Sequence, residues 1–468
     1  MHIVAVGGSD AGISAGLRIR EVDPGADVTV VAADAYPNFS ICGIPYYVSG
    51  EVPSWQNLAH RTIPDLEAAG MMLRLDTTAQ RVDVPDRKLL VTSPDGDEEV
   101  IGYDKLVIGT GAVPVRPPIA GLDTLGTGDG VHLLHSMGDT FALMRTLEQA
   151  APASAVIVGA GYIGLEMADA LITCGLRVTQ MEQLPEVLPT VDPELGALVH
   201  AELASHGVEV LARTAVQRIS KAPAGAAGRL QVEAATTDGD PVTRTADLVL
   251  IVVGVRPDTD LAVSAGAGLG ARGAIAVDRQ MRTGLPDIYA AGDCVTTHHR
   301  LLGETYLPLG TTAHKQGRVA GENACGGNRE YAGSLGTQVV KIYDQAAART
   351  GLRDDEARSA GYDPVTIASG ADDHKAYYPG SHRIAMRFTG DRRTGRLLGV
   401  QLFGHKDAEI AKRVDIAATA IFHSMTVDAI SDLDLSYTPP LGSPWDAIQA
   451  GAQAWTRQAS SGYNQLPR

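Results

Sequence analysis

The chain has 468 residues, which is too long for one hydrophobic core and predicts two or three domains. Its net charge of −16 argues against nucleic acid or an anionic membrane as a partner. Although 44% of the residues are hydrophobic, no apolar run approaches the roughly 18 residues of a membrane helix. We therefore expect a globular protein that acts on a small molecule.

The four cysteines lie far apart, at irregular spacing. Such spacing predicts neither a disulfide framework nor a zinc site, so we expect no bound metal. The start of the chain is short and lacks the charged flank of a signal peptide. A reducing cytoplasm is therefore the predicted compartment. The cysteines are Cys42, Cys174, Cys294 and Cys325.

The start of the chain predicts a strand–helix–strand unit. Ile3–Val6 is a short apolar strand, and Gly7–Gly12 is a glycine turn before a helix over Ile13–Val22. A turn of this kind lets the backbone approach a pyrophosphate at the helix N-terminus. Ser9 replaces the middle glycine, and Asp34 is the acid nearest to the end of the second strand. A purely structural turn explains this unit equally well.

Phe39–Tyr47 contains a single cysteine before a Gly-Pro turn. Gly43 and Pro45 would end a strand and start a helix, with Cys42 near its N-terminus. Backbone N–H groups and the helix dipole there favour a thiolate, which attacks disulfides, reduces peroxides or donates charge into an oxidised ring. A small buried apolar residue is the simpler interpretation of an isolated cysteine. The nucleotide-binding segments on either side favour the reactive interpretation.

A second unit is more complete. Gly159, Gly161 and Gly164 form a G-x-G-x-x-G turn after the strand Ala155–Val158. Glu182 ends the next strand, 18 residues after Gly164, close to the separation expected for an acid that binds ribose. Its carboxylate would accept from both ribose hydroxyls and repel a 2′-phosphate. The second unit therefore predicts NADH, with NADPH less favoured.

Two such units, with a reactive cysteine beside the first, predict FAD together with NAD(P)H. Tyr103–Gly111 is an apolar strand that runs into a turn at Thr110 and Gly111. Ile288–Cys294 is a strand that leads to an acid at a helix start. That acid, Asp293, would bind a ligand hydroxyl or, alternatively, cap the helix.

The order of these motifs resembles the single-cysteine branch of the flavoprotein disulfide reductases, which includes CoA-disulfide reductases, NADH oxidases and NADH peroxidases. The resemblance implies an α/β protein with two Rossmann-like dinucleotide-binding domains and a C-terminal α+β dimerisation domain. It implies FAD domain segments 1–113 and 245–325, an NAD(P)H domain 114–244, a dimerisation domain 330–455 and a flexible tail 456–468. Further motifs that carry it are Val253–Pro257, Ala291–Asp293, Leu307–Ala313, Gly351–Leu352, Glu356–Ala357 and Tyr437–Pro440.

The resemblance also implies roles for single residues. Cys42 would be the redox cysteine against the flavin. Tyr437, with Tyr378 or Tyr377, would come from the partner subunit and stabilise the thiolate or protonate a leaving sulfur. An ordinary loop aromatic explains Tyr377 and Tyr378 equally well. FAD would be held by Gly7, Gly12, Thr110, Gly111 and Asp293, the nicotinamide cofactor by Gly159, Gly161, Gly164 and Glu182, and further cofactor contacts would come from Ser9, Asp34, Gly254, Thr312 and Ala313.

The chain departs from these relatives at positions that affect the substrate. Peroxidase and oxidase relatives place a histidine where this chain has Asp10, and a carboxylate near the thiol would raise the thiol pKa. CoA-disulfide reductases place cations where this chain has Glu21 and Trp445, although Arg18 would compensate in part. Trp445 would stack on a less charged ligand or pack in an interface. We predict Arg18, Asn38 and Trp445 as substrate contacts.

Together these observations predict a homodimer with shared active sites. NADH would reduce FAD, and Cys42 would pass the electrons to a small disulfide, persulfide or related acceptor, with CoA disulfide disfavoured. An NADH oxidase that reduces dioxygen is one alternative. A redox-sensing flavoprotein, whose dimer contacts change with the FAD state, is another.

Overall fold

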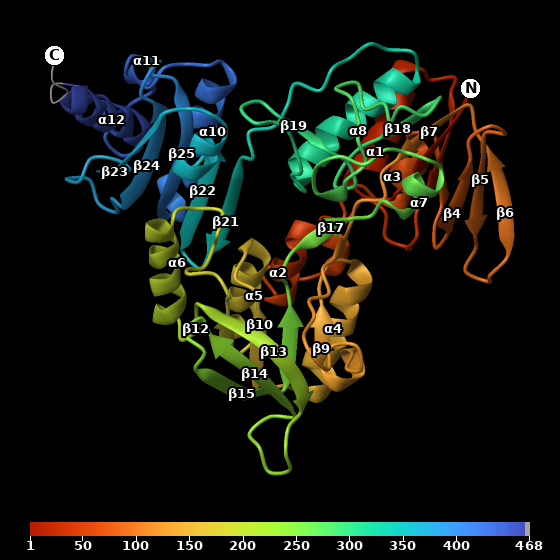
Figure 1. Cartoon of the computed structure of the whole chain (residues 1–468), viewed down its shortest axis with the longest axis horizontal. Coiled ribbons are helices and arrows are strands. Elements are labelled where there is room, and N and C mark those ends of the chain that lie inside the picture. The colour runs from red at the N-terminus through yellow and green to blue at the C-terminus, as the bar shows by residue number, and fades with distance from the viewer. Residues whose placement is uncertain (464–468) are drawn as a thin grey trace. The chain divides into compact units, whose positions relative to one another are not determined.

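The computed structural model describes residues 1–463, which fall into two compact units (Figure 1). The first unit is discontinuous in sequence because the chain leaves it to build parts of the second unit and then returns. Among the described residues, no helix has the length and apolar character needed to cross a membrane. The first unit comprises residues 1–116, 133–144 and 254–334, and the second comprises 117–132, 145–253 and 335 onward.

The first unit is built on a five-stranded parallel sheet with the order β18-β7-β1-β2-β3. Alternate residues of β1 face opposite sides, since Ile3 and Ala5 lie in one apolar cluster and Val4 and Val6 in the other. Helices α1 and α8 cover the side of Ile3 (Figure 1). These elements are β1 (His2–Val6), α1 (Asp10–Val22), β2 (Asp27–Val31), β3 (Met71–Arg74), β7 (Lys105–Ile108), β18 (Ile288–Ala290) and α8 (Gly310–Ala324).

Helices α1 and α8 approach closely because small residues face one another across the contact. A Cβ at Gly317 would lie 2.3 Å from the carbonyl oxygen of Ala11, and one at Gly321 would lie 2.4 Å from that of Ala15. Any larger side chain would push the helices apart. This packing fixes the start of α8, including His314, against the start of α1.

Smaller elements complete the first unit. An antiparallel sheet of β4, β5 and β6 packs on the side of the parallel sheet that carries Val4. The elements are η1 (Ile41–Gly43), α2 (Ile44–Val48), η2 (Trp55–Leu58), α3 (Ile63–Ala68), β4 (Thr78–Asp83), β5 (Lys88–Thr92), β6 (Glu98–Gly102), β8 (Ala112–Pro114), β17 (Val255–Pro257), α7 (Asp260–Ser264), η4 (Ala271–Gly273), β19 (Thr297–His299) and β20 (Gly303–Thr305).

The second unit contains another five-stranded sheet, with the order β12-β11-β10-β16-β9. Its strand β16 (Leu248–Ile251) is entirely buried and pairs in parallel with β10. The sheet therefore extends beyond the domain boundary expected at residue 244. The other elements here are η3 (Thr127–Asp129), β9 (Val131–Leu133), β10 (Ser154–Val158), α5 (Tyr162–Thr173), β11 (Arg177–Met181), α6 (Pro193–Ser205), β12 (Glu209–Leu211) and an antiparallel sheet of β13 (Thr214–Lys221), β14 (Leu230–Thr236) and β15 (Pro241–Ala246). Helix α4 (Met137–Ala150) begins in residues of the first unit and ends in residues of the second.

The C-terminal part of the second unit is an antiparallel sheet with the order β21-β22-β25-β24-β23 and helices against it. Its last helix, α12 (Ala447–Tyr463), corrects the flexible tail expected over 456–468, because the helix continues through Tyr463. Trp455 anchors the helix by donating from Nε1 to the carbonyl oxygen of Val365 at 2.8 Å. Residues 464–468 lie outside the described part. The remaining elements are β21 (Gln338–Ile342), β22 (Gln345–Gly351), α9 (Asp354–Ser359), β23 (Pro364–Asp372), β24 (Arg383–Asp391), β25 (Leu397–His405), η5 (Lys406–Ala408), α10 (Ile410–Phe422) and α11 (Val427–Ser431).

Candidate active site

The first glycine turn, between β1 and α1, is packed so closely that only glycine fits at two positions. Gly7 has φ +113°, and a Cβ there would lie 2.0 Å from the carbonyl oxygen of Gly109. A Cβ at Gly12 would lie 2.0 Å from the carbonyl oxygen of Gly7. Ser9 is the N-cap of α1, and its side chain makes no capping hydrogen bond. The first N–H groups of α1 therefore suit an anionic ligand such as a pyrophosphate.

Two polar side chains near this turn have buried atoms without hydrogen-bond partners among the described residues. Asn38 is 1% exposed, and neither polar atom of its amide group has a partner. Its backbone N–H donates to the carbonyl oxygen of Gly8 at 2.7 Å, which ties Asn38 to the turn. Oδ1 of Asp293 is also buried without a hydrogen bond. Because buried polar atoms are normally satisfied, these atoms fit a ligand rich in hydroxyl and carbonyl groups, such as FAD.

The acids predicted for this site follow strands of the parallel sheet. Burial and, to a smaller extent, the charge of Asp10 together raise the pKa of Asp293 to about 7. A hydroxyl donated by a ligand would stabilise the charged form of Asp293 and reverse part of this shift. Asp34 follows β2, and its carboxylate accepts the backbone N–H of Tyr36 at 3.0 Å. Burial raises the pKa of Asp34 as well.

The other residues predicted for FAD come from elements of the same unit. Thr110 donates from Oγ1 to the carbonyl oxygen of Asp258 at 2.6 Å. A Cβ at Gly111 would meet no atom within 4 Å, so a ligand has room beside its backbone. Thr312 and Ala313 are buried in the first turn of α8.

The second glycine turn, between β10 and α5, repeats the geometry of the first. Gly159 has φ +106°, and a Cβ at Gly164 would lie 2.2 Å from its carbonyl oxygen. Gly161 is the N-cap of α5 and has open space around it. Glu182 follows β11 directly and accepts the backbone N–H groups of Ala160 at 2.8 Å and Leu184 at 2.9 Å. Glu182 therefore lies beside this turn, and its role in binding a ribose stays a prediction.

Gly254 is the remaining glycine that we predicted to contact a cofactor. It has φ +104°, and a Cβ there would meet no atom within 4 Å. Its carbonyl oxygen accepts the backbone N–H of Val115 at 3.0 Å. The residue thus lies in an open turn of the first unit, before β17.

Cys42 lies in the middle of η1, and this single turn leads into α2. The residue is exposed, and Pro45 lies in the first turn of α2, as the sequence predicted. Burial raises the pKa of Cys294 to about 11 and also raises the pKa of Cys174 and Cys325. Cys174 is also exposed, at the end of α5.

The aromatic residues predicted to complete the site lie on the C-terminal part of the second unit. Tyr378, Tyr437 and Trp445 are 44%, 45% and 56% exposed, respectively. The segments that carry them adjoin, since the backbone N–H of Lys375 donates to the carbonyl oxygen of Pro439 at 3.4 Å. These side chains are thus presented outward from neighbouring segments of one domain.

Arg18, predicted to compensate for missing cations, is held by two carboxylates. Its guanidinium lies 2.8 Å from Glu21 and 2.7 Å from Glu322. Glu21 also pairs with Arg318 at 2.9 Å, and these two arginines lower the pKa of Glu21 to about 2. Much of the positive charge at the end of α1 is therefore already neutralised.

A pocket of about 540 Å³ opens along α1 and α8 in the first unit. The sequence motifs did not reveal most of its residues. His314 and Arg318 are four residues apart and so share a helix face, but no sequence signal says that this face packs on α1. His60 and Arg61 come from a loop without a recognisable motif. The pocket is lined by Ser14, Leu17, Glu21, His60, Arg61, His314 and Arg318.

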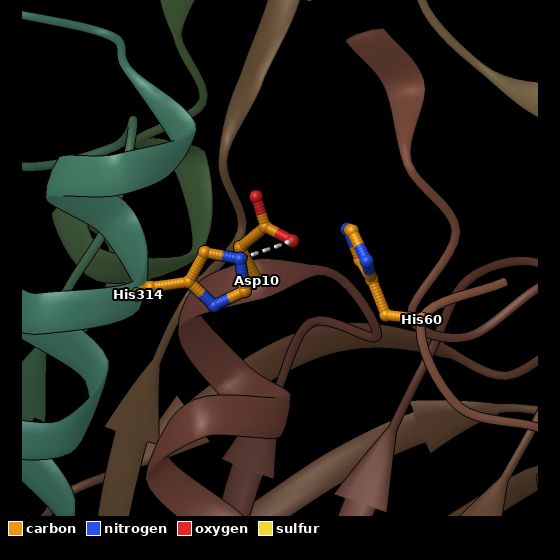
Figure 2. A group of neighbouring side chains, drawn as sticks. All are labelled: Asp10, His60 and His314. Carbon is orange, nitrogen blue, oxygen red and sulfur yellow. Dashed lines mark ion pairs between the residues drawn. The ribbon is translucent and has the colours of Figure 1, made fainter. Parts of the chain in front are cut away.

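Asp10, at the start of α1, lies between two of these pocket residues (Figure 2). Nε2 of His314 lies 3.3 Å from Oδ1 of Asp10, and Nδ1 of His314 lies 2.9 Å from Oγ of Ser14. The rings of His60 and His314 have their centroids 6.0 Å apart. Burial raises the pKa of Asp10, and the two histidines lower it by a smaller amount. Two imidazoles thus adjoin the position where some relatives carry a histidine.

Comparison with known proteins covers nearly the whole chain. The sequence model of the pyridine nucleotide-disulphide oxidoreductases matches residues 1–317, and that of their dimerisation domain matches 337–447. The NAD(P)H sulfur oxidoreductase (CoA-dependent) of Pyrococcus furiosus is 35% identical over 448 residues, which are 95% of this chain and 97% of that protein. The NADH oxidase of Methanocaldococcus jannaschii is 32% identical over 467 residues, 98% of this chain and 100% of that protein. The structure of a NAD-dependent persulfide reductase from A. fulgidus is 35% identical and superimposes with a TM-score of 0.91, covering 98% of this chain and 84% of that one.

Proposed function

This chain belongs to the pyridine nucleotide-disulphide oxidoreductase family, and we propose that it is an NADH-dependent reductase of small persulfides or disulfides. The family is FAD-dependent and takes electrons from NAD(P)H, so the chain is a flavoprotein oxidoreductase. In our proposal, electrons pass from NADH through FAD to sulfur on Cys42, and the sulfur–sulfur bond of the acceptor is broken there.

The observation that carries the proposal is the setting of Cys42. It is exposed in the unit that holds the first glycine turn, on a short turn that leads into a helix. Burial raises the pKa of the thiols of Cys174, Cys294 and Cys325, which favours their protonated form at neutral pH. Since the thiolate is the nucleophile, we assign the sulfur chemistry to Cys42.

The residues divide the reaction between them. FAD, when bound by Asp293 and the first glycine turn, supplies the two-electron relay between NADH and sulfur. The thiolate of Cys42 attacks one sulfur of the acceptor, a Cys42–sulfur bond forms, and the acceptor's sulfur–sulfur bond breaks. The departing thiolate takes up a proton. Two electrons from NADH then reduce the sulfur bound to Cys42, which releases the second product with another proton and restores the thiolate.

The acceptor is proposed as a class, a small molecule with a sulfur–sulfur bond. The relatives that support this class are named as acting on sulfur or persulfide, and the protein from P. furiosus is named as CoA-dependent. CoA itself stays disfavoured here because Glu21 pairs with both Arg18 and Arg318. A phosphate group would have to compete with this carboxylate for the two cations.

We place the aromatic residues in the partner's site. The exposed Tyr437 and Tyr378 lie on the domain that matches the family's dimerisation domain. In a homodimer, their hydroxyls would reach the partner's sulfur site and protonate the departing thiolate. We place the enzyme in the cytoplasm, where a reactive thiol stays reduced.

A steady-state screen tests the proposal. NADH oxidation should be fast with a glutathione persulfide, polysulfide or another small disulfide, slower with CoA disulfide, and slow in air alone. Fast oxidation in air, independent of any sulfur compound, would favour the NADH oxidase alternative. That alternative has a structural basis, since His314 lies 3.3 Å from Asp10 and supplies an imidazole near the position where oxidase relatives have one.

A further inference from the structure

The carboxylate of Asp10 lies between the imidazoles of His60 and His314, and each of these residues offers one ligand atom (Figure 2). These three atoms lie within 4.8 Å of one another. Donors around a tetrahedral zinc ion, at about 2.0–2.2 Å from it, are roughly 3.3–3.5 Å apart. The separation of 3.3 Å between Nε2 of His314 and Oδ1 of Asp10 already meets this requirement. The side chain of His60 is exposed, and its ligand atom lies within 4.8 Å of the other two, so it has to move closer to complete the set.

The surroundings hold two of the three groups in a geometry suited to metal binding. Oγ of Ser14 lies 2.9 Å from Nδ1 of His314, so a hydrogen bond there leaves Nε2 for the metal. Asp10 is fixed at the first turn of α1, and its Oδ1 accepts no hydrogen bond from the described residues. The close contact of α1 with α8, through Gly317 and Gly321, sets the spacing between the two groups.

We propose that Asp10, His60 and His314 form a binding site for one zinc ion per chain. Two imidazoles and one carboxylate suit zinc, whereas magnesium prefers a shell of oxygen ligands. His60 and His314 also line the pocket along α1 and α8, so a metal ion has a route from solvent. With three protein ligands, the fourth position faces this pocket and accepts water or the sulfur of a thiolate.

The site replaces the expectation, drawn from cysteine spacing, that the chain binds no metal. Its ligands come from positions 10, 60 and 314, and only the fold brings them together. An ion pair between protonated His314 and Asp10 is the alternative explanation of this geometry. That ion pair requires no contribution from His60, which distinguishes the two explanations.

Zinc titration of the FAD-loaded enzyme by calorimetry at pH 7.5 tests the site. Titration in a Cys42→Ser, Cys174→Ser background removes both exposed thiols as competing ligands. We expect one zinc ion per chain and no binding of magnesium. His60→Ala, His314→Ala and Asp10→Asn should each weaken zinc binding at least about tenfold, the loss expected for one ligand of the set. His423→Ala, an exposed histidine of the other unit, is the matched control and should bind zinc like the parent.

Zinc absorption-edge spectroscopy on the same samples identifies the ligands. The expected result is a shell of nitrogen and oxygen atoms at about 2.0–2.1 Å with imidazole scattering, and no sulfur at about 2.3 Å. If Asp10→Asn fails to retain FAD, His60→Ala decides, because His60 lies on a loop outside the glycine turn. The proposal is overturned if zinc does not bind one-to-one, if His60→Ala binds zinc with unchanged affinity, or if the spectrum shows a sulfur shell.

Discussion

The two glycine turns have nearly the same backbone geometry but different polar side chains around them. Gly7 and Gly159 have φ +113° and +106°. A Cβ at Gly12 or Gly164 would clash with the carbonyl oxygen of the first glycine of its turn. The two parallel sheets therefore present nearly the same cradle to a dinucleotide. What differs is how much of the polar surface around each cradle is already satisfied by the protein.

The acid beside the second turn already has hydrogen-bond partners within the protein. Glu182 accepts two backbone N–H groups, from Ala160 and Leu184, without any ligand. Around the first turn, Asn38 and Asp293 keep buried polar atoms without partners. An acid that is already hydrogen-bonded by the protein suits a cofactor that enters and leaves at each turnover. A site with unsatisfied polar atoms suits a cofactor that stays bound, because these buried atoms are left without hydrogen-bond partners when the cofactor leaves.

The largest effect that this comparison predicts is loss of FAD from Asp293→Ala. A hydrogen bond to a charged group contributes about 1.5–3 kcal/mol, so FAD affinity should fall roughly 10- to 150-fold. Flavin absorbance after dialysis and titration of stripped protein with FAD measure the change. Asp95→Ala, at an exposed turn of the same unit, is the control and should keep its FAD. Full flavin content in Asp293→Ala would mean that its unsatisfied oxygen does not face the cofactor.

The second turn predicts a selective effect on the nicotinamide cofactor. The parent should prefer NADH over NADPH at least about tenfold, or roughly 1.4 kcal/mol, because Glu182 repels the 2′-phosphate. Glu182→Gln should erase most of this preference and leave FAD bound. Glu194→Gln, an exposed acid of α6, should change neither property. Steady-state kcat/KM for both cofactors decides, and an unchanged ratio in Glu182→Gln shows that the carboxylate faces away from the ribose.

A smaller effect is expected from the aromatic residues of the C-terminal domain. Tyr437→Phe removes one hydroxyl, so sulfur-dependent turnover should fall about 2- to 10-fold, the value of one hydrogen bond. Flavin reduction by NADH should stay near the parent rate. Tyr362→Phe in the same unit is the control. If rapid mixing shows flavin reduction falling as much as turnover, Tyr437 acts on the nicotinamide side instead.

The smallest predicted effect concerns pH. The folded chain raises the pKa of Asp293 from 3.8 to about 7, so the folded state holds more protons between these values. The free energy of unfolding of FAD-stripped protein should therefore fall as pH rises through this window. Between about pH 6.2 and 7.5 this amounts to about 1 kcal/mol, so we expect Tm to drop roughly 2–4 °C more in the parent than in Asp293→Asn. If Tm changes with pH in the same way in both proteins, the raised pKa of Asp293 is contradicted.

The sequence predicted the parts of the site that depend on local patterns. Apolar strands followed by glycine turns located both cradles, and Glu182 lies where the strand-end spacing placed it. Prediction from the sequence failed where an element's limits depend on packing between distant segments. The four apolar residues of β16 complete a sheet begun almost a hundred residues earlier, so the predicted boundary at 244 came too early. Helix α12 (Ala447–Tyr463), with its Ala-rich start, extends into the predicted tail.

The pocket residues show the same limit at the level of the site. His60, His314 and Asp10 come together through the contact of α1 with α8 and a loop that follows Asn38. No spacing in the sequence predicts that these three residues lie together. Glycines 317 and 321 carry the only local hint, since small residues at four-residue spacing permit a close helix contact, but they do not identify the partner helix.

Rapid mixing of the Cys42→Ser variant tests the central claim most directly. The parent and the variant, both loaded with FAD, are mixed with NADH and then with a small persulfide while flavin absorbance is followed. We predict that NADH reduces the flavin at nearly the parent rate in the variant, while reoxidation by the persulfide is lost and long-wavelength charge-transfer absorbance is absent. Cys174→Ser and Cys325→Ser should behave like the parent. Reoxidation of the Cys42→Ser flavin by persulfide within a few-fold of the parent rate would contradict the account and make Cys42 a structural residue.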